Sequence, residues 1–219
     1  MEINTKDILR KYIDNQFHDV KVDIAMGLME ARAELILKDS KYDEMYIDPK
    51  VDILNSDPQV IQQVKEELQG FLNLLLDNKV KNLLQIGLGH WASTHFVLSL
   101  LIDQVTTVEY DEEHVKRYIA HASPQHEKII TGDSLEAYKD MEDNTFDAVF
   151  IDANHSYEYV KKDLENYYKK VKIGGIIALH DVNFEGDRYG IPRVLRESTA
   201  NWIKISYSDE VGIAYTIKE

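Results

Sequence analysis

Hydrophobic side chains recur at helical spacing through the first 80 residues of the chain. Two such stripes, over Ile8–Ile13 and Ile24–Leu35, predict two helices. A loop over Lys41–Pro58 follows, interrupted by two Asp-Pro pairs, and a third stripe predicts a helix over Gln59–Leu76. Residues 1–80 therefore form a predicted helical segment, which we expect to cover a binding crevice as a lid, to form a dimer interface, or both.

From residue 81 the pattern changes to short apolar runs separated by amphipathic stretches. The runs predict five buried strands, over Leu83–Ile86, Val105–Val108, Lys128–Thr131, Ala148–Ile151 and Ile176–Leu179. Helical patterns lie between them, over Ser93–Ile102, Asp111–His121, Leu135–Met141 and the stretch before the Gly174-Gly175 turn. Two last runs, Ile203–Ser208 and Gly212–Ile217, predict an antiparallel hairpin. Residues 81–219 are thus predicted to form a doubly wound α/β domain, with a mostly parallel seven-stranded sheet and an antiparallel C-terminal hairpin.

Polar residues stand where two neighbouring strands of this sheet end. Asp152 follows one strand, His180 and Asp181 end the next, and His155 lies shortly after Asp152. The carboxyl ends of adjacent parallel strands face the ligand crevice, so we expect these four side chains to meet at one place. The alternative is that Asp152 and Asp181 only cap the loops that follow them.

A glycine-rich turn, Gly87-Leu88-Gly89, follows the first predicted strand. Such a turn lets a ligand approach the backbone near a helix N-terminus, although it also occurs where a helix merely packs close to a strand. Glu109 ends the second strand, where an acid commonly accepts hydrogen bonds from a ribose. Asp133 and Ser134 follow the third strand, where a polar group can meet an adenine. Together these strand ends predict a site for an adenosine-containing ligand. The sequence contains no Gly-x-x-x-x-Gly-Lys-Ser/Thr loop, so nothing in it supports a nucleotide triphosphatase.

The formal net charge of -14 argues against nucleic-acid binding, because the phosphate backbone rewards Lys and Arg. The chain has no cysteine for a disulfide framework, which suits a reducing cytosol. Its charged N-terminus has no apolar core of signal-peptide length, and the longest nearly uncharged apolar stretch, around Phe96–Ile102, is too short to cross a bilayer. We therefore expect a cytoplasmic protein with neither nucleic-acid nor membrane partners.

Several motifs of the second part of the chain occur together in one known family. They are Gly87, Gly89 and Ser93, then Ile151-Asp152-Ala-Asn-His155-Ser-Tyr157, Asp163-Leu164, Gly174-Gly175 and His180-Asp181. With them, the region from about Leu83 to Glu219 resembles the class I S-adenosylmethionine-dependent methyltransferases, in particular the small-molecule O-methyltransferase group called methyltransferase family 24. The chain departs from the family pattern at Gln85, where an acid that helps hold the methionine moiety is usual. It departs again at Trp91, where a third glycine is usual and an indole would crowd the pocket unless it points away.

This resemblance implies a Rossmann-like fold, S-adenosylmethionine as cofactor, and methyl transfer to the hydroxyl of a small molecule such as a sugar or a secondary metabolite. The implied cofactor residues are Gln85, Gly87, Gly89, His90, Ser93, Glu109, Asp133, Ser134 and Asp152. In relatives of catechol O-methyltransferase, acids at the ends of the fourth and fifth strands hold a divalent cation. The matching residues here are Asp152, His180 and Asp181, and the ion would be magnesium, manganese or a similar metal. The candidate catalytic residues are Asp152, His155 and His180, and either histidine is an alternative general base.

Electrostatic repulsion gives a physical reason for the cation, because two uncompensated carboxylates at Asp152 and Asp181 would force one of them to take up a proton. The loop after the fifth strand offers Phe184, Arg188 and Tyr189 as candidate substrate contacts. His90, beside the glycine turn, is a candidate for cofactor contact. The remaining histidines fit structural positions, and they are His18, His95, His114, His121 and His126. Two other functions stay open: a cofactor-binding module without turnover, and another metal-dependent reaction on the same fold. We also expect a homo-oligomer.

Overall fold

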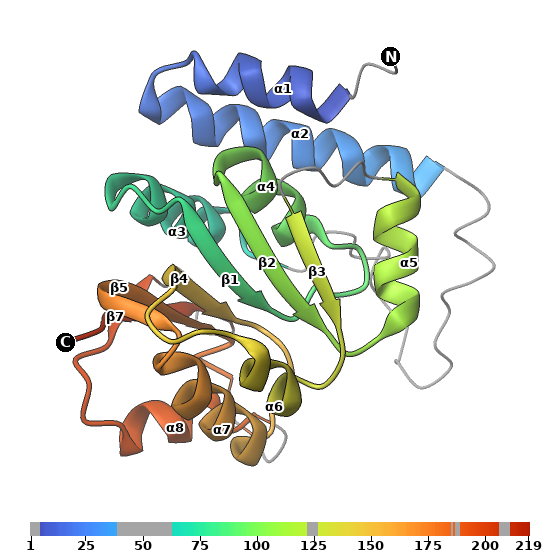
Figure 1. Ribbon diagram of the computed structural model, residues 1–219. Coiled ribbons are helices and arrows are strands. Elements are labelled where there is room, and N and C mark those ends of the chain that lie inside the picture. Colours follow the sequence, from blue (N-terminus) through green and yellow to red (C-terminus); the bar gives the residue numbers. More distant parts are fainter. Residues whose placement is uncertain (1–4, 39–62, 122–126, 185, 187–188, 206–210) are drawn as a thin grey trace.

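The computed structural model describes residues 5–38, 63–121, 127–184, 186, 189–205 and 211–219 (Figure 1). The predicted loop Lys41–Pro58 and the candidate substrate contact Arg188 lie outside these residues. None of the helices in the described part of the chain is both long enough and apolar enough to pass through a bilayer.

Seven strands of the described residues form one sheet in the order β3-β2-β1-β4-β5-β7-β6. They are β1 (Asn82–Ile86), β2 (Gln104–Glu109), β3 (Glu127–Thr131), β4 (Phe146–Ile151), β5 (Val171–His180), β6 (Ile203–Ile205) and β7 (Ile213–Ile217). Strand β7 runs antiparallel to β5 and β6, and the other neighbours are parallel. The prediction of a mostly parallel seven-stranded sheet with an antiparallel C-terminal hairpin is confirmed.

Helices cover both faces of this sheet (Figure 1). One face carries α1 (Thr5–Asp14), α2 (His18–Lys38), α3 (Lys65–Asp77) and α4 (Ser93–Leu101), and α5 (Glu112–His121) packs against β2 and β3. The other face carries α6 (Ser134–Ala137), the 3-10 turn η1 (Tyr138–Asp140), α7 (Tyr157–Tyr168) and α8 (Ile191–Glu197). Along β1, Leu83 belongs to the first core and Leu84 to the second. Because both faces are buried, the strands appear in the sequence as continuous apolar runs.

The N-terminal helices share a core with the sheet. Leu68, Phe71 and Leu75 on α3 are fully buried, and the Phe71 ring lies 4.8 Å from the Phe150 ring of β4. Burial of one such side chain stabilises a fold by roughly 1.5–3 kcal/mol. Helix α3 is therefore fixed against β4, the strand that ends just before Asp152.

The start of α3 differs from the prediction of a helix over Gln59–Leu76. The helix begins at Lys65, since Val64 has the extended backbone angles φ -73° and ψ 124°. Gln63 precedes it in a bend, and Gln59 lies outside the described residues. A hydrophobic stripe marks the face of a helix but not the residue where it begins.

Two further differences follow β4. Strand β5 begins at Val171 rather than Ile176, and the Gly174-Gly175 pair lies within it, where the Gly174 N–H donates to the Lys218 carbonyl at 2.8 Å. Helix α8 begins at the end of the loop predicted after the fifth strand and continues to Glu197, through residues for which no element was predicted. Pro192 stands in its first turn, a position where the missing N–H has no intrahelical partner to lose.

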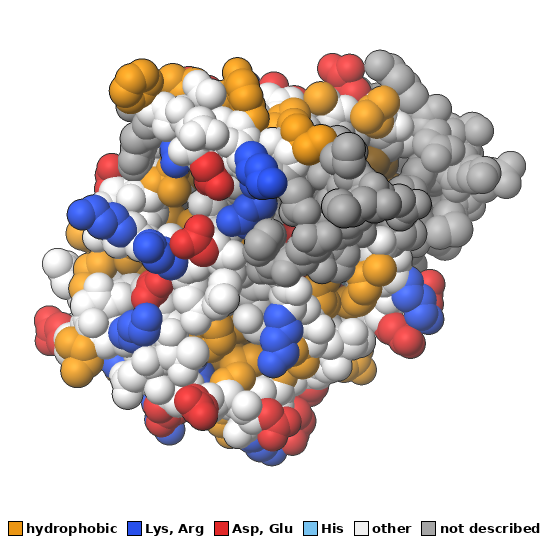
Figure 2. All heavy atoms as spheres, turned by 45° about the horizontal axis from the view of Figure 1, so that its top comes forward, with side chains coloured by type: hydrophobic (Ala, Val, Ile, Leu, Met, Phe, Trp, Pro, Cys, Tyr) orange, Lys and Arg blue, Asp and Glu red, His pale blue; other side chains and the backbone are white. Residues whose placement is uncertain are grey.

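The N-terminal helices and their connection leave several large apolar side chains exposed (Figure 2). Ile8 and Tyr12 on α1 are 53% and 58% exposed, Phe17 between the two helices is 84% exposed, and Leu35 on α2 is 69% exposed. Contiguous exposed apolar side chains can mark a contact with another protein, whereas single ones are common on any protein surface.

Candidate functional site

The carboxyl ends of β1, β2, β4 and β5, with the turn after β3, open into one cavity of about 810 Å³. Every site residue that the sequence predicted lines this cavity: Gln85, Gly87, Gly89, His90, Ser93, Glu109, Asp133, Ser134, Asp152, His155, His180 and Asp181. The strand ends that were expected to meet do meet, and the role of each side chain remains a prediction.

The glycine turn lies against the end of β4. Gly87 and Gly89 have φ values of 96° and 74°, which favour glycine. A Cβ atom on Gly87 would lie 1.9 Å from the carbonyl oxygen of Asp152, so only glycine permits this close approach. Gln85 is buried, donates from Nε2 to the Gly87 carbonyl at 2.8 Å, and has its Oε1 3.2 Å from Nδ1 of His95. The Gln85 side chain thus holds the glycine turn, at a position where an acid is usual in the family that the chain resembles.

Two arginines hold the residues that continue this turn. Arg117 donates to the His90 carbonyl at 2.7 Å, and Arg32 of α2 donates to the Trp91 carbonyl at 2.8 Å. The Arg117 guanidinium also lies 5.3 Å from the centroid of the Trp91 ring, a cation–π distance. Trp91 forms part of the cavity wall, and Ser93 is buried at the start of α4.

Glu109 at the end of β2 is buried and bonded to the glycine turn. Its Oε2 accepts from the N–H groups of Leu88 and Gly89 at 2.7 and 3.2 Å, and its Oε1 accepts from the Asp111 N–H at 2.8 Å. Burial alone would raise the pKa of Glu109, but the adjacent His114 and these N–H groups hold it below its ordinary value. An ionised acid here fits the expected ribose acceptor, and it also supports the turn.

The residues after β3 form a helix cap. Asp133 Oδ1 accepts from the Leu135 N–H at 2.9 Å at the start of α6. Ser134 is buried, and its carbonyl accepts from the Tyr167 hydroxyl at 2.7 Å. These bonds fix the turn at the cavity wall, while contact with an adenine stays a prediction.

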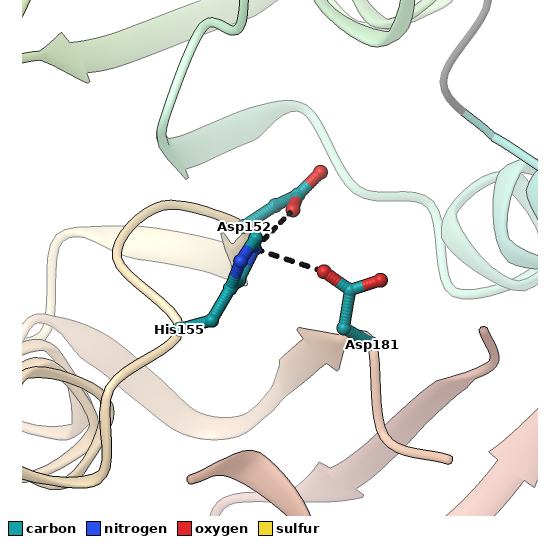
Figure 3. Close-up of side chains that lie close together, drawn as sticks. All are labelled: Asp152, His155 and Asp181. Carbon is teal, nitrogen blue, oxygen red and sulfur yellow. Dashed lines mark ion pairs between the residues drawn. The ribbon is translucent and has the colours of Figure 1, made fainter. Parts of the chain in front are cut away.

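Asp152, His155 and Asp181 form a compact cluster at the ends of β4 and β5 (Figure 3). Nε2 of His155 lies 2.8 Å from Oδ2 of Asp181 and 3.8 Å from Oδ1 of Asp152. His180 is buried, and its Nδ1 lies 3.2 Å from Oδ1 of Asp152 and 3.3 Å from Oδ1 of Asp181. Asp181 has a φ of 57°, a left-handed conformation that is uncommon outside glycine.

Both histidines lie close enough to the two acids to be considered as metal ligands. Ligand atoms of Asp152, His155 and Asp181 all lie within 4.8 Å of one another, so these three residues can share one ion. The resemblance implies His180 as the third ligand, and its Nδ1 does face both acids. Its Nε2 is buried and has no hydrogen-bond partner among the described residues. His155 is held beside the acids by its backbone, because the Gly190 N–H donates to its carbonyl at 2.7 Å.

The two histidines neutralise the two acids. Burial alone would lower the pKa values of His155 and His180, but the adjoining carboxylates raise them to about 9 and about 10. Burial would raise the pKa of Asp152, but His180 and His155 hold it far below its usual range, and the pKa of Asp181 is lowered for the same reason. The charge of Asp152 still acts to raise the pKa of Asp181, as expected for two neighbouring carboxylates, but the two imidazoles more than offset this repulsion when protonated.

Aromatic rings form the wall beside this cluster. The Tyr189 ring stacks on His155, with centroids 5.2 Å apart, and on Phe184, with centroids 4.6 Å apart. All three residues line the cavity. Phe184 and Tyr189 line the cavity, and their role as substrate contacts stays a prediction.

Sequence reasoning missed two residues of the cavity. Gln63 precedes α3 and donates from Nε2 to Oδ2 of Asp152 at 3.0 Å. His114 was assigned a structural role, yet it lines the cavity beside Glu109, with its ring 4.3 Å from that of His90. A histidine one turn into the helix after a strand-end acid is a weak signal for His114. No local pattern identifies Gln63.

Comparisons with known proteins agree with this arrangement. Residues 84–182 match the model of a protein family described as a methyltransferase domain. A candidate O-methyltransferase of Mycobacterium ulcerans is 28% identical over 123 residues, which cover 52% of this chain and 53% of that protein. The chain spans about half or less of the length of the curated relatives that it matches.

Solved structures share the fold. A candidate caffeoyl-CoA O-methyltransferase of Staphylococcus aureus gives a TM-score of 0.57 at 21% identity, covering 91% of this chain and 100% of that one. The O-methyltransferase of Bacillus cereus, solved in complex with S-adenosylhomocysteine, gives a TM-score of 0.55 at 21% identity, covering 75% and 83%. The Rossmann-like architecture that the sequence predicted is therefore confirmed.

Proposed function

We propose that this chain transfers a methyl group from S-adenosylmethionine to a hydroxyl of a small molecule, and the match of residues 84–182 to the model of a methyltransferase-domain family supports this proposal. The observation that carries the proposal is the cavity shared by the glycine turn, Glu109 and the acid–histidine cluster. A site suited to adenosine and a site suited to a hydroxyl thereby adjoin, as transfer between two bound molecules requires.

A divalent ion, magnesium or manganese, is part of the proposal. Asp152, His155 and Asp181 would hold it, with His180 as a further candidate ligand, since their ligand atoms are already close together. Carboxylates suit magnesium, and an imidazole adds affinity for manganese. Such an ion, when bound, lowers the pKa of a substrate hydroxyl.

The protonation state of the cluster affects both the metal role and the alternative of a histidine general base. With pKa values of about 9 and about 10, His155 and His180 hold their protons at neutral pH in the protein alone. A protonated imidazole cannot accept the proton of a hydroxyl, nor can it bind a metal. Metal affinity should therefore rise from pH 6 to pH 9, as His155 loses its proton.

The chain's own residues supply the other parts of the acceptor site. The stacked rings of Tyr189 and Phe184 offer an apolar wall beside the cluster. Such a wall suits the ring of a sugar or of a secondary metabolite, and it limits the access of water to the transferred methyl group.

Calorimetry with S-adenosylhomocysteine, with and without magnesium or manganese, tests cofactor and ion in one series. We expect the wild-type chain to bind the cofactor product, and Asp152→Asn to weaken metal binding at least tenfold. Asp140→Asn removes an exposed carboxylate from η1 and is the matched control, which should leave both affinities unchanged.

The outcome also separates the alternatives. Full methyl transfer after exhaustive chelation would contradict the metal and leave His155 or His180 as the leading base. Cofactor binding without transfer to any hydroxyl compound would favour a binding module without turnover. That alternative is supported by Gln85, whose side chain bonds the glycine turn where the family usually has an acid for the methionine moiety. A cytoplasmic location and a homo-oligomer remain part of the proposal, and the exposed apolar side chains of α1 and α2 support the oligomer.

A further inference from the structure

Gln63 carries a buried amide oxygen that no described residue uses. Its Nε2 donates to Oδ2 of Asp152, whereas its Oε1 is shielded from solvent and has no hydrogen-bond partner among the described residues. A buried acceptor without a donor lowers stability, so such an atom calls for an explanation. Because Gln63 lines the cavity, a bound molecule can supply the missing donor.

The packing of α3 aims this side chain. The Phe71 ring packs against the Phe150 ring of β4 in a tilted arrangement, and Glu67 is fully buried and accepts from the Gly212 N–H through Oε2 at 2.9 Å. These contacts join the first turns of α3 to the strands that end at the cavity. Gln63 lies two residues before the first residue of this anchored helix, and its Nε2 contacts Asp152.

The strand order indicates which part of the cofactor lies beside Gln63. In the proposed function Glu109 and Asp133 take the adenosine end over β2 and β3, so the opposite end lies over β1 and β4. Gly87 and Asp152 adjoin there. That end of the cofactor carries an ammonium group, which only donates hydrogen bonds, and a carboxylate, which only accepts them. Next to the Asp152 carboxylate, an unused acceptor favours the ammonium group.

We propose that Gln63 recognises the ammonium group at the methionine end of the cofactor through Oε1 and positions Asp152 through Nε2. This inference rests on the proposed function. It makes Gln63 a specificity residue for the amino-acid part of the cofactor, contributed by the N-terminal helical segment and not by the matched methyltransferase domain.

The test compares two ligands that differ in that part. S-Adenosylhomocysteine contains the amino-acid end, and 5′-methylthioadenosine lacks it. Calorimetry is carried out with the full chain and with Gln63→Met, which keeps the length of the side chain and removes both polar atoms. We expect the affinity for S-adenosylhomocysteine to fall about tenfold or more, the effect of one hydrogen bond to a charged group, and the affinity for methylthioadenosine to stay unchanged.

Two other variants control for folding and chemistry. Gln69→Met makes the same change on α3 away from the cavity, where Gln69 donates to Asp23 at 2.7 Å, and it should alter neither affinity. Gln63→Glu keeps an acceptor oxygen for the ammonium group but loses the Nε2 donor to Asp152, so it should retain an affinity ratio in favour of S-adenosylhomocysteine that Gln63→Met loses. Retention of that ratio distinguishes recognition of the ammonium from a fault in folding.

The possible outcomes separate the inference from the proposed function. Equal weakening of both ligands in Gln63→Met, or no weakening of either, would overturn the inference while leaving the proposed function intact. Unchanged affinity for S-adenosylhomocysteine with a raised KM for the acceptor would place Gln63 at the acceptor instead, and would also overturn it. If the wild-type chain bound neither nucleoside, the proposed function would fail, and the inference with it.

Discussion

Asp163 on α7 is a buried acid that the proposed reaction does not use. It is fully buried, and neither carboxylate oxygen makes a well-formed hydrogen bond with the described residues. Burial raises the pKa of Asp163 to about 6, and the nearby charge of Asp133 adds to the rise. We predict that this carboxylate destabilises the fold at neutral pH and that Asp163→Asn removes the effect.

The magnitude follows from the difference between the folded and unfolded states. The folded pKa of about 6 lies above the ordinary value of 3.8, so between these values the folded state binds a proton that the unfolded state has lost. The free energy of unfolding therefore falls as pH rises through this range and levels off above pH 6. The difference between the two pKa values corresponds to roughly 3 kcal/mol. The buried amide of the variant carries a cost of its own, about 1–3 kcal/mol, but that cost does not depend on pH.

Urea unfolding of both proteins at pH 4 and pH 7 measures the effect. The stability of Asp163→Asn relative to the wild type should increase by about 2 kcal/mol between these pH values. Glu165→Gln removes an exposed carboxylate from the same helix and should show no such change. A difference between Asp163→Asn and the wild type that is the same at both pH values would refute the argument, because it would show that the folded state does not raise this pKa.

Two other predictions concern the cofactor site and the N-terminal helices. Glu109→Ala should weaken S-adenosylhomocysteine binding about tenfold or more, and calorimetry that finds no change would remove Glu109 from the site. Because Glu109 also accepts from the Leu88 and Gly89 N–H groups, Glu109→Gln, which keeps an acceptor, should bind more tightly than the alanine variant. Sedimentation should show an oligomer, and a strict monomer at all concentrations would contradict a dimer interface on α1 and α2. A Lys81–Glu219 fragment should be insoluble, since it would expose the sheet face that α1–α3 cover; a soluble fragment with normal substrate binding would exclude the lid.

The fold was predictable because its central strands are buried on both faces. Leu83 and Leu84 face different cores, so neither position tolerates a polar residue, and the strand stands out in the sequence. Polar residues then mark the point where such a strand leaves the core, as Asp152 and Asp181 do. The edges were less predictable. Helix α8 is short and begins with Gly190-Ile191-Pro192, a pattern that also fits a loop.

The contacts within the site were less predictable than its position. Gln63 reaches Asp152 across 89 residues of sequence, and no periodicity relates the two. The positions of His155 and His180 relative to the acids depend on side-chain conformation and on the path of the loop after β4, which the Gly190–His155 backbone bond helps to fix. Spacing alone places both histidines near the acids but does not show which of them shares an ion with both carboxylates.

The charge balance of the cluster is harder to predict from the sequence than its position in the fold. Two acids at neighbouring strand ends carry two negative charges with no obvious counter-charge in the sequence. This imbalance led to the prediction of a bound cation. In the structure His155 and His180 carry that charge themselves when protonated. A divalent ion with two neutral imidazoles gives the cluster the same net charge as two protonated imidazoles without an ion. The acids therefore do not require a metal to be stable, and the case for one rests on the closeness of the ligand atoms and on the chemistry of the hydroxyl.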